Sequence, residues 1–259
     1  MSWFESWAQV SAPWRLLRVV AAGVAVTLTL SACQKENEAG CFTSTGSIVT
    51  ERRALPPFRV LTSNDNVRVT LVQDSETYAE VRAGRNLQED IRLGVQNGHL
   101  TIRNTSRCNW VRRYNTPREV TLHTPRLTDI FLRGQADIQT QGTFKADTLF
   151  AHLIGSGDFH LTLSSTYLGM SQYELGDIYL SGTTQELHHT IGGNGSMYAQ
   201  DFALQDLYLQ TNADSNGKGY VAPTRLLTGN HAGAGTVYYH GTPSAVTLRV
   251  TGKGKLTRE

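Results

Sequence analysis

The sequence predicts an all-β protein in which repeats of a parallel β-helix, or solenoid, follow a β-rich leading part. From Pro57 onward, apolar and polar residues alternate with the period of two that is typical of strands. Between residues 134 and 259, short glycine-containing turns recur about every 20 residues. After residue 33, no stretch combines a helical apolar stripe with helix caps. The chain of 259 residues is long enough for such a unit.

The first 32 residues have the features of an export signal that is removed from the mature protein. Arg15 and Arg18 precede an uncharged apolar run, residues 19–30, and small residues follow it. This order of a basic region, a short apolar region and small residues is typical of secretory signal peptides. The run is too short to cross a membrane as a helix, which needs about 20 residues.

The end of this segment, Leu30-Ser31-Ala32-Cys33, resembles the lipobox of bacterial lipoproteins. In those proteins the cysteine is acylated and becomes the mature N-terminus. The resemblance implies a protein held to a membrane of the bacterial cell envelope, the outer membrane, through Cys33, facing the periplasm or the surface. The alternative is an ordinary cleaved signal with a chance cysteine. Polar residues follow Cys33, and residues 33–56 are predicted to form a tether.

Export would place the other two cysteines, Cys41 and Cys108, in an oxidising compartment. With Cys33 lipidated, they are the one pair that can form a disulfide. Such a bond would close a long loop and stabilise the fold by roughly 4 kcal/mol. The alternative is two free buried thiols.

The leading part, residues 57–133, contains several short alternating segments bounded by Gly, Asn or Pro. Asn97-Gly98 separates two of these segments and is the strongest short signal for a β-hairpin. The sequence therefore predicts several strands here, at least two of them antiparallel.

The second half, residues 134–259, repeats itself. Each turn is followed by an apolar anchor residue, and these anchors are Ile138, Phe159, Ile178, Met197, Val237 and Leu256. The first four are spaced by 21, 19 and 19 residues, and the last two by 19. The 40 residues between Met197 and Val237 leave room for two units. Strands with this period and no helix are typical of a solenoid, in which like side chains stack. An antiparallel sandwich is the competing fold.

Three of the turns carry an aspartate, at Asp137, Asp158 and Asp177. In a solenoid these side chains would form one column. Stacked carboxylates can raise one another's pKa or bind a cation. The other interpretation is a structural ladder, in which each aspartate caps local backbone N–H groups. The short, repetitive turns favour the ladder, so we predict neither a metal site nor a cofactor.

Other residues with catalytic potential are not arranged for chemistry. His188 and His189 are adjacent in a predicted strand, so they point to opposite faces and cannot easily share a metal ion. We interpret both as solvated strand histidines. The serines have no matched His and Asp, so the sequence predicts no catalytic triad and no enzyme.

Tyrosines are concentrated in the repeats. They are Tyr173, Tyr179, Tyr198, Tyr208, Tyr220, Tyr238 and Tyr239. An exposed column of these rings could stack against sugar rings or contact a protein. The alternative is that they are ordinary residues of half-buried strands.

The charge of the chain argues against nucleic acid as a partner. There are 24 Lys+Arg and 22 Asp+Glu, a formal net charge of +2, whereas nucleic-acid binding normally needs a concentrated basic face.

Several segments from Pro57 to the C-terminus resemble the bacterial family described as putative auto-transporter adhesin, head GIN domain. The segments that carry the resemblance are Phe58 with Val60, residues 97–102, 108–110, 125–130, 155–158 and 233–243. The turns depart from the family's usual Gly-Ser-Gly at Gly233-Ala234-Gly235 and Gly252-Lys253-Gly254, and Leu175-Gly176-Asp177 lacks its leading glycine. These departures affect local turn geometry.

The resemblance implies a right-handed parallel β-helix with a β-rich leading part, and an envelope lipoprotein with an adhesive or binding role. The expected partners are the membrane, through Cys33, and a glycan or an envelope or host protein. The alternatives are a carbohydrate-active β-helix enzyme and a periplasmic structural or sensory protein that binds an envelope partner.

Overall fold

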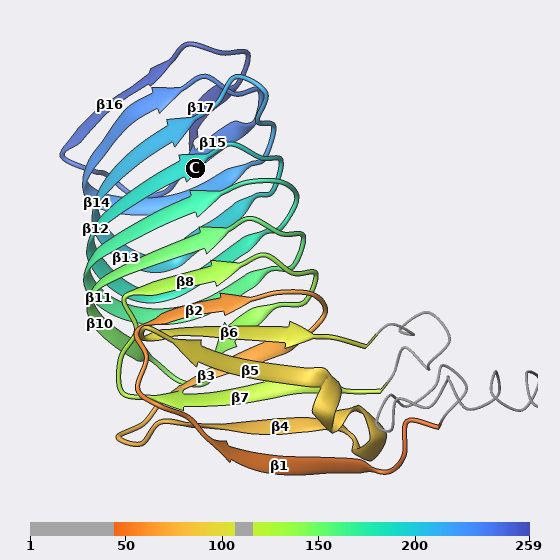
Figure 1. Cartoon of the computed structure of the whole chain (residues 1–259). Coiled ribbons are helices and arrows are strands. Elements are labelled where there is room, and N and C mark those ends of the chain that lie inside the picture. The colour runs from red at the N-terminus through yellow and green to blue at the C-terminus, as the bar shows by residue number, and fades with distance from the viewer. Residues whose placement is uncertain (1–43, 107–115) are drawn as a thin grey trace, which may run out of the picture. The chain divides into compact units, whose positions relative to one another are not determined.

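The computed structural model describes residues 44–106 and 116–259. They form a β-solenoid of about six turns (Figure 1). The first elements are β1 (Ile48–Ala54), β2 (Val60–Ser63), β3 (Arg68–Gln73), β4 (Tyr78–Gly84), the 3-10 helix η1 (Arg85–Asp90), β5 (Ile91–Gln96), β6 (His99–Asn104) and β7 (Arg118–Thr124). The next are β8 (Asp129–Leu132), β9 (Ile138–Thr140), β10 (Phe144–Leu153), β11 (Phe159–Gln172), β12 (Ile178–Ile191) and β13 (Met197–Thr211). The last are β14 (Gly219–His231), β15 (Thr236–Tyr239), β16 (Ala245–Val250) and β17 (Lys255–Arg258).

The strands from β8 to β17 stack in parallel and in chain order, one coil on the next (Figure 1). The predicted anchors pair in register, from Ile138 with Phe159 to Val237 with Leu256. Gly219 occupies the anchor position between Met197 and Val237, which accounts for the two units predicted there. The parallel solenoid is confirmed, and the antiparallel sandwich is wrong.

The leading part belongs to the same stack, although its order in space differs from its order in the chain. β2 lies between β6 and β8, and β3 lies between β7 and β9, all in parallel. The pairs β1–β4, β4–β7 and β5–β6 are antiparallel. Asn97 and Gly98 have φ angles of 52° and 74°, so the predicted hairpin between β5 and β6 is confirmed.

The tether prediction for residues 33–56 is wrong for its last part. Residues 48–54 form β1, which pairs with β4 along its whole length. The polar composition that predicts a tether agrees with the exposure of most of β1, but it does not reveal the backbone pairing. The stability of β1 therefore depends on the backbone ladder with β4 and on Arg53, which donates to the carbonyl oxygens of Gln88 and Ile91.

The interior of the coils is filled by columns of apolar side chains. One column contains Leu149, Leu168, Leu187, Leu207 and Leu227, which pair in register and are fully buried. Burying each such side chain stabilises the fold by about 1.5–3 kcal/mol. Stacking identical shapes lets each coil pack on the next without a change of spacing.

Glycine is required at one corner because the backbones of successive coils approach closely there. A Cβ atom on Gly195 would lie well under 3.0 Å from the carbonyl oxygen of Gly176, which leaves no room for a side chain. The same close approach recurs in each turn, at Gly157, Gly176, Gly195, Gly217, Gly235 and Gly254. The repeated glycine in the sequence is thus a packing requirement between coils.

His189 departs from its predicted environment. Its side chain points inward in the row of Met170 and Leu209 and is only 1% exposed, so the prediction of a solvated histidine is wrong there. Neither ring nitrogen has a hydrogen-bond partner. Burial lowers the pKa of His189 from 6.5 to about 3, so the ring is neutral at pH 7. His188, one residue earlier, points outward as the strand alternation predicts.

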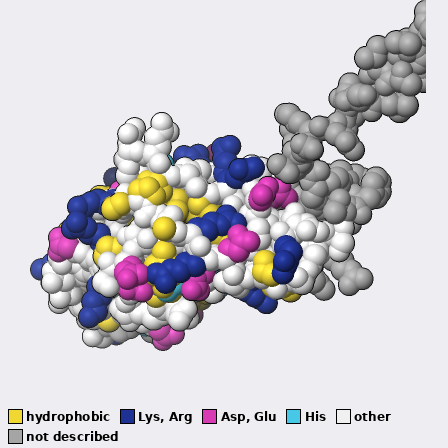
Figure 2. All heavy atoms as spheres, turned by 60° about the horizontal axis from the view of Figure 1, so that its bottom comes forward, with side chains coloured by type: hydrophobic (Ala, Val, Ile, Leu, Met, Phe, Trp, Pro, Cys, Tyr) yellow, Lys and Arg dark blue, Asp and Glu magenta, His cyan; other side chains and the backbone are white. Residues whose placement is uncertain are grey.

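The end of the solenoid that carries β1 and β4 has a mixed surface. Figure 2 brings this end forward and shows basic and acidic side chains interspersed on it. On the face shown, an anion would therefore be bound by a local group of side chains rather than by a broad basic field. Among the helices of the described residues, none is long and apolar enough to span a membrane.

Candidate binding face

The three predicted aspartates lie in one column on an outward-facing sheet, and each contacts the next coil. The backbone N–H of Asp158 donates to Oδ1 of Asp137 at 3.1 Å, and that of Asp177 donates to Oδ1 of Asp158 at 2.8 Å. Ser196 continues the pattern by donating its N–H to Asp177 at 2.7 Å. We call this column the aspartate ladder. Its partners are in the next coil, so the prediction of local caps is wrong in that detail.

The ladder uses one oxygen of each carboxylate to join coils. Within residues 44–106 and 116–259, no group of three or more His, Cys, Asp or Glu is arranged to hold a metal ion. Cation binding by the ladder stays a prediction, and these hydrogen bonds do not require it.

A column of aromatic rings runs beside the ladder, two residues further along each strand. Its members are His160, Tyr179, Tyr198, Tyr220 and Tyr238, which pair in register on successive strands. Neighbouring ring centroids are 4.6–5.3 Å apart, and the ring planes differ by only 3–9°. We call this set the tyrosine column. It confirms that four of the predicted tyrosines form one column.

The stacking decides what the tyrosine column can offer to a partner. Each inner ring has its two faces covered by its neighbours, so the π faces are not available as platforms for sugar rings. The ring edges and phenol hydroxyls remain, and a phenol hydroxyl both donates and accepts hydrogen bonds. The Tyr179 hydroxyl lies 3.5 Å from Oδ2 of Asp177, which links the column to the ladder. Burial and the nearby carboxylates raise the pKa of Tyr179, so it keeps its proton at pH 7.

A second aromatic group lies on another face of the coils. The His188 ring stacks on Tyr208, with centroids 4.3 Å apart, and lies 5.1 Å from Tyr167. His188 also hydrogen-bonds Glu186 at 2.5 Å. Phe150 adjoins Tyr167 and is 38% exposed.

The second aromatic group also includes an ion pair between Arg225 and Asp206. The guanidinium of Arg225 binds both carboxylate oxygens of Asp206, whose side chain is almost fully buried. This contact raises the pKa of Arg225, which therefore stays charged. The second group is thus joined by its own hydrogen bonds and ion pairs. The tyrosines of both groups are half-buried, and the tyrosine column differs in forming one in-register row over five successive strands.

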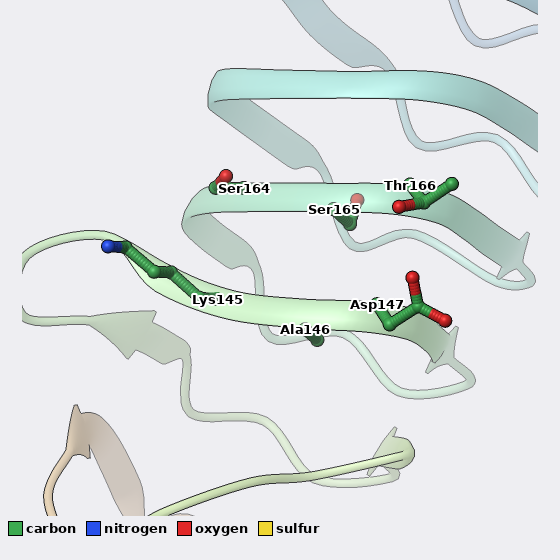
Figure 3. A pocket seen from close by; sticks show the side chains of 6 residues that line it. All are labelled: Lys145, Ala146, Asp147, Ser164, Ser165 and Thr166. Carbon is green, nitrogen blue, oxygen red and sulfur yellow. The ribbon is translucent and has the colours of Figure 1, made fainter.

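A polar hollow of about 320 Å³ lies between the beginning of β10 and the middle of β11 (Figure 3). From β10, Lys145 and Asp147 extend toward opposite ends of the hollow. Its other side is lined by Ser164, Ser165 and Thr166 of β11. Ser165 donates its hydroxyl to Thr184 at 2.9 Å. Lys145 and Asp147 line this hollow and no histidine does, so its serines do not form a Ser-His arrangement there.

The remaining predicted residues lie elsewhere. Cys33, Cys41 and Cys108 are outside the described residues, so the lipid anchor and the disulfide stay predictions. Tyr208 belongs to the second aromatic group, Tyr239 packs against the core, and Tyr173 lies at a corner over Gly192.

Sequence reasoning missed His160 as the first ring of the tyrosine column. The signal was present, because His160 precedes Tyr179 by 19 residues, the period of the repeat. It also missed the second aromatic group, whose members come from two different positions of each coil.

Comparisons with known proteins give the same fold. A putative adhesin from Bacteroides fragilis matches with a TM-score of 0.73 and 19% identity, over 82% of this chain and 97% of that one. A putative adhesin from Parabacteroides merdae matches with a TM-score of 0.65 and 20% identity, over 83% and 98%. A putative lipid binding protein from Parabacteroides distasonis matches with a TM-score of 0.63 and 17% identity, over the same shares.

At these identities the structural matches establish the fold alone. A search of curated proteins found no match. The family model for putative auto-transporter adhesin, head GIN domain matches residues 57–243, which is well over half of the sequence. An adhesin-like family of this kind points to a protein associated with the cell envelope or surface. The chain therefore belongs to the putative auto-transporter adhesin, head GIN domain family.

Proposed function

We propose that this protein is a non-catalytic lipoprotein of the bacterial cell envelope that binds a partner through the face formed by the tyrosine column and the aspartate ladder. The observation that carries the proposal is the regular row of stacked rings on an outward sheet. Backbone ladders on both sides hold the inner strands of this sheet, so the row is ordered before any partner arrives. A preorganised surface loses little entropy on binding.

The partner that best fits this face is a protein. Phenol edges and carboxylates offer hydrogen bonds in a line, and tyrosine is enriched where proteins meet. Sugar stacking would need free ring faces, which the inner rings of the column do not have. The family's adhesin description agrees with a binding role and leaves the partner open.

The test compares two double variants of the full chain on cells. Tyr198→Thr with Tyr220→Thr removes the centre of the tyrosine column, and threonine suits a strand. Tyr167→Thr with Tyr208→Thr is the matched control in the second aromatic group. We would count cells adhering to surfaces coated with fibronectin, collagen or mucin. Cells lacking the protein give the background.

We expect the column variant to lose at least ten-fold of the adhesion above background and the control variant to keep it. Equal loss in both variants would contradict the assignment of the face. Adhesion at background level for the wild-type protein on all three surfaces would contradict the adhesive role and favour a periplasmic partner.

Anchoring through Cys33 is part of the same proposal and has its own test. The lipobox-like segment Leu30-Ser31-Ala32-Cys33 supports it. Cells grown with a radiolabelled fatty acid should label the wild-type protein and not the Cys33→Ser variant. Labelling of both, or of neither, would contradict acylation at Cys33.

A further inference from the structure

A pocket of about 540 Å³ is lined by residues of β3, β4 and β7 and of the segments beside them. These three strands lie at the lower end of the solenoid in Figure 1. Three arginines line it, Arg68 from β3, Arg82 from β4 and Arg118 from β7. The other polar side chains that matter here are Asn66, Gln135 and Glu119. We call this the arginine pocket. Its position is set by the fold, because Arg82, Glu119 and Arg68 pair across three neighbouring strands.

Two of these arginines, Arg68 and Arg82, are only partly neutralised by the described residues. Arg82 donates to Glu119 at 2.8 Å, and this is the single acid among the lining residues. The nearest acid to Arg68 is Asp137 at 3.9 Å, which is too far for a hydrogen bond. Asp137 already accepts from the backbone of Asp158 through its other oxygen. The Arg68 guanidinium, 53% exposed, therefore has donors available to a ligand.

The neutral residues add donors on one side. Oδ1 of Asn66 accepts from the side-chain amide of Asn104 at 2.7 Å, which leaves the Asn66 NH₂ group as its available donor. Gln135 lies beside it in the turn before β9, where its N–H binds the carbonyl oxygen of Asp65. The pocket thus combines guanidinium and amide donors, the set that recognises an oxyanion.

The surroundings make this basic spot distinctive. Between residues 134 and 244 the coils carry three Lys or Arg and nine Asp or Glu, and the four further basic residues of the coils lie in the last one, after residue 244. An acidic ligand would be repelled along the coils and held at the pocket. The volume is within the range of small-ligand sites, and larger than one oxyanion needs.

We propose that the arginine pocket binds an acidic carbohydrate, through the carboxylate or sulfate of a uronate or sulfated sugar residue. Arg68 and Arg82 hold the oxyanion, and Asn66 and Gln135 hydrogen-bond the neighbouring hydroxyls. A sugar is favoured over an acidic peptide because most of the described lining residues are polar, and Asn66 and Gln135 can hydrogen-bond hydroxyl groups beside the oxyanion. This proposal adds a ligand class to the proposed binding function, and the arginine pocket is a separate site from the tyrosine column.

The test measures binding by calorimetry with the full chain in detergent, at low and physiological salt. The probes are a tetragalacturonate, a heparin-derived hexasaccharide, inorganic sulfate and a poly-glutamate peptide. Arg68→Gln with Arg82→Gln removes two charges from the pocket. Arg92→Gln with Arg103→Gln removes two charges from exposed arginines of the β5–β6 hairpin and is the matched control.

We expect one or both oligosaccharides to bind the wild type and the control alike, and to lose at least ten-fold in affinity for the pocket variant. The affinity of the Arg68→Lys variant should lie between those of the wild type and the pocket variant. Lysine keeps the positive charge but cannot make the bidentate contact of a guanidinium. The proposal is overturned if neither oligosaccharide binds, if both double variants lose affinity equally, or if only inorganic sulfate or poly-glutamate binds. The tyrosine-column variant should bind the oligosaccharide normally, so failure of the proposed function would be seen separately.

Discussion

The leading part and the stacked coils each contain a large buried polar side chain, Gln88 and His189, and only Gln88 has hydrogen-bond partners. In the leading part, the amide nitrogen of Gln88 donates to the carbonyl oxygens of Val49 and Val81, and its oxygen accepts from Arg53. In the coils, His189 is equally buried and has no partner. The leading part thus uses side chains to join strands that are distant in the chain.

The coils are joined by backbone ladders and by shape, and other buried polar side chains in them do bridge neighbouring coils. Gln172 donates to the carbonyl oxygen of Ser196, and the Thr211 hydroxyl bonds the His231 ring. His189 has no such partner, so it adds nothing to the stacking.

The largest effect is expected from a methyl group placed where the backbones of two coils touch, because this tests whether the coils are joined by close packing. Gly195→Ala would put its Cβ into the backbone of Gly176, so we expect a loss of about 3 kcal/mol or more in unfolding free energy. Gly94→Ala in β5 is the control, since no atom lies within 4 Å of its added Cβ. Urea denaturation of both variants measures the difference. Equal, small effects would show that the corner is not close-packed.

His189→Leu should stabilise the coils, because leucine suits the row of Met170 and Leu209 and removes two unpartnered nitrogens. We expect a gain of about 2 kcal/mol at pH 7, from the cost of a buried unpaired polar group. A loss of stability on this substitution would show that the histidine has a structural partner.

The same variant changes the response to acid. The pKa of His189 is about 3 when folded and near 6.5 when unfolded, so the unfolded state binds more protons between these values. Stability contributed by the neutral ring is complete above pH 6.5 and falls by about 1.4 kcal/mol per pH unit below it. Urea unfolding measured from pH 7 to pH 4 should show that the unfolding free energy of His189→Leu lacks this part of its dependence on pH. An unchanged slope would contradict the buried neutral ring.

Gln88→Leu should have the opposite sign from His189→Leu. It removes the donor from two buried carbonyl oxygens and the acceptor from Arg53, so we expect a loss of about 1.5 kcal/mol. Urea denaturation at pH 7 compares the two leucine variants directly. If the two substitutions changed the unfolding free energy in the same direction, the contrast between a partnered Gln88 and an unpartnered His189 would be wrong.

The smallest expected effect concerns turn geometry. Glu174 has a φ of 65°, a left-handed conformation that Gly155 and Gly193, at the same position of the neighbouring coils, do not adopt. Glu174→Gly should raise unfolding free energy by about 1 kcal/mol, since a non-glycine residue pays roughly that cost in the left-handed region. Asn97→Gly, at φ 52°, is the control and should gain less, because asparagine tolerates this conformation. Thermal unfolding of the two variants is sensitive enough to rank them.

The sequence predicted the coils well because each coil repeats the last. The spacing of Ile138, Phe159, Ile178 and Met197 fixed both the period and the register, and even the gap filled by Gly219 was visible. The tyrosine column followed from the same period. His189 was misjudged because alternation shows that neighbours point to opposite faces, and does not show which face is buried.

The leading part could not be predicted to the same depth. β2 lies between β6 and β8 in space, and this order depends on long-range pairing that no local pattern records. The arginine pocket has the same origin. Asn66, Arg82, Arg118 and Gln135 are far apart in the sequence, and only the order of β3, β4 and β7 brings them together.

The central claim, a binding module of the cell envelope, is tested most directly by its accessibility on living cells. An antibody raised against residues 44–259 would be applied to intact cells and to permeabilised cells as the control. We predict staining of intact cells that is lost in a strain lacking the protein. Staining only after permeabilisation would contradict an adhesive role at the surface and place the binding face toward a partner inside the envelope.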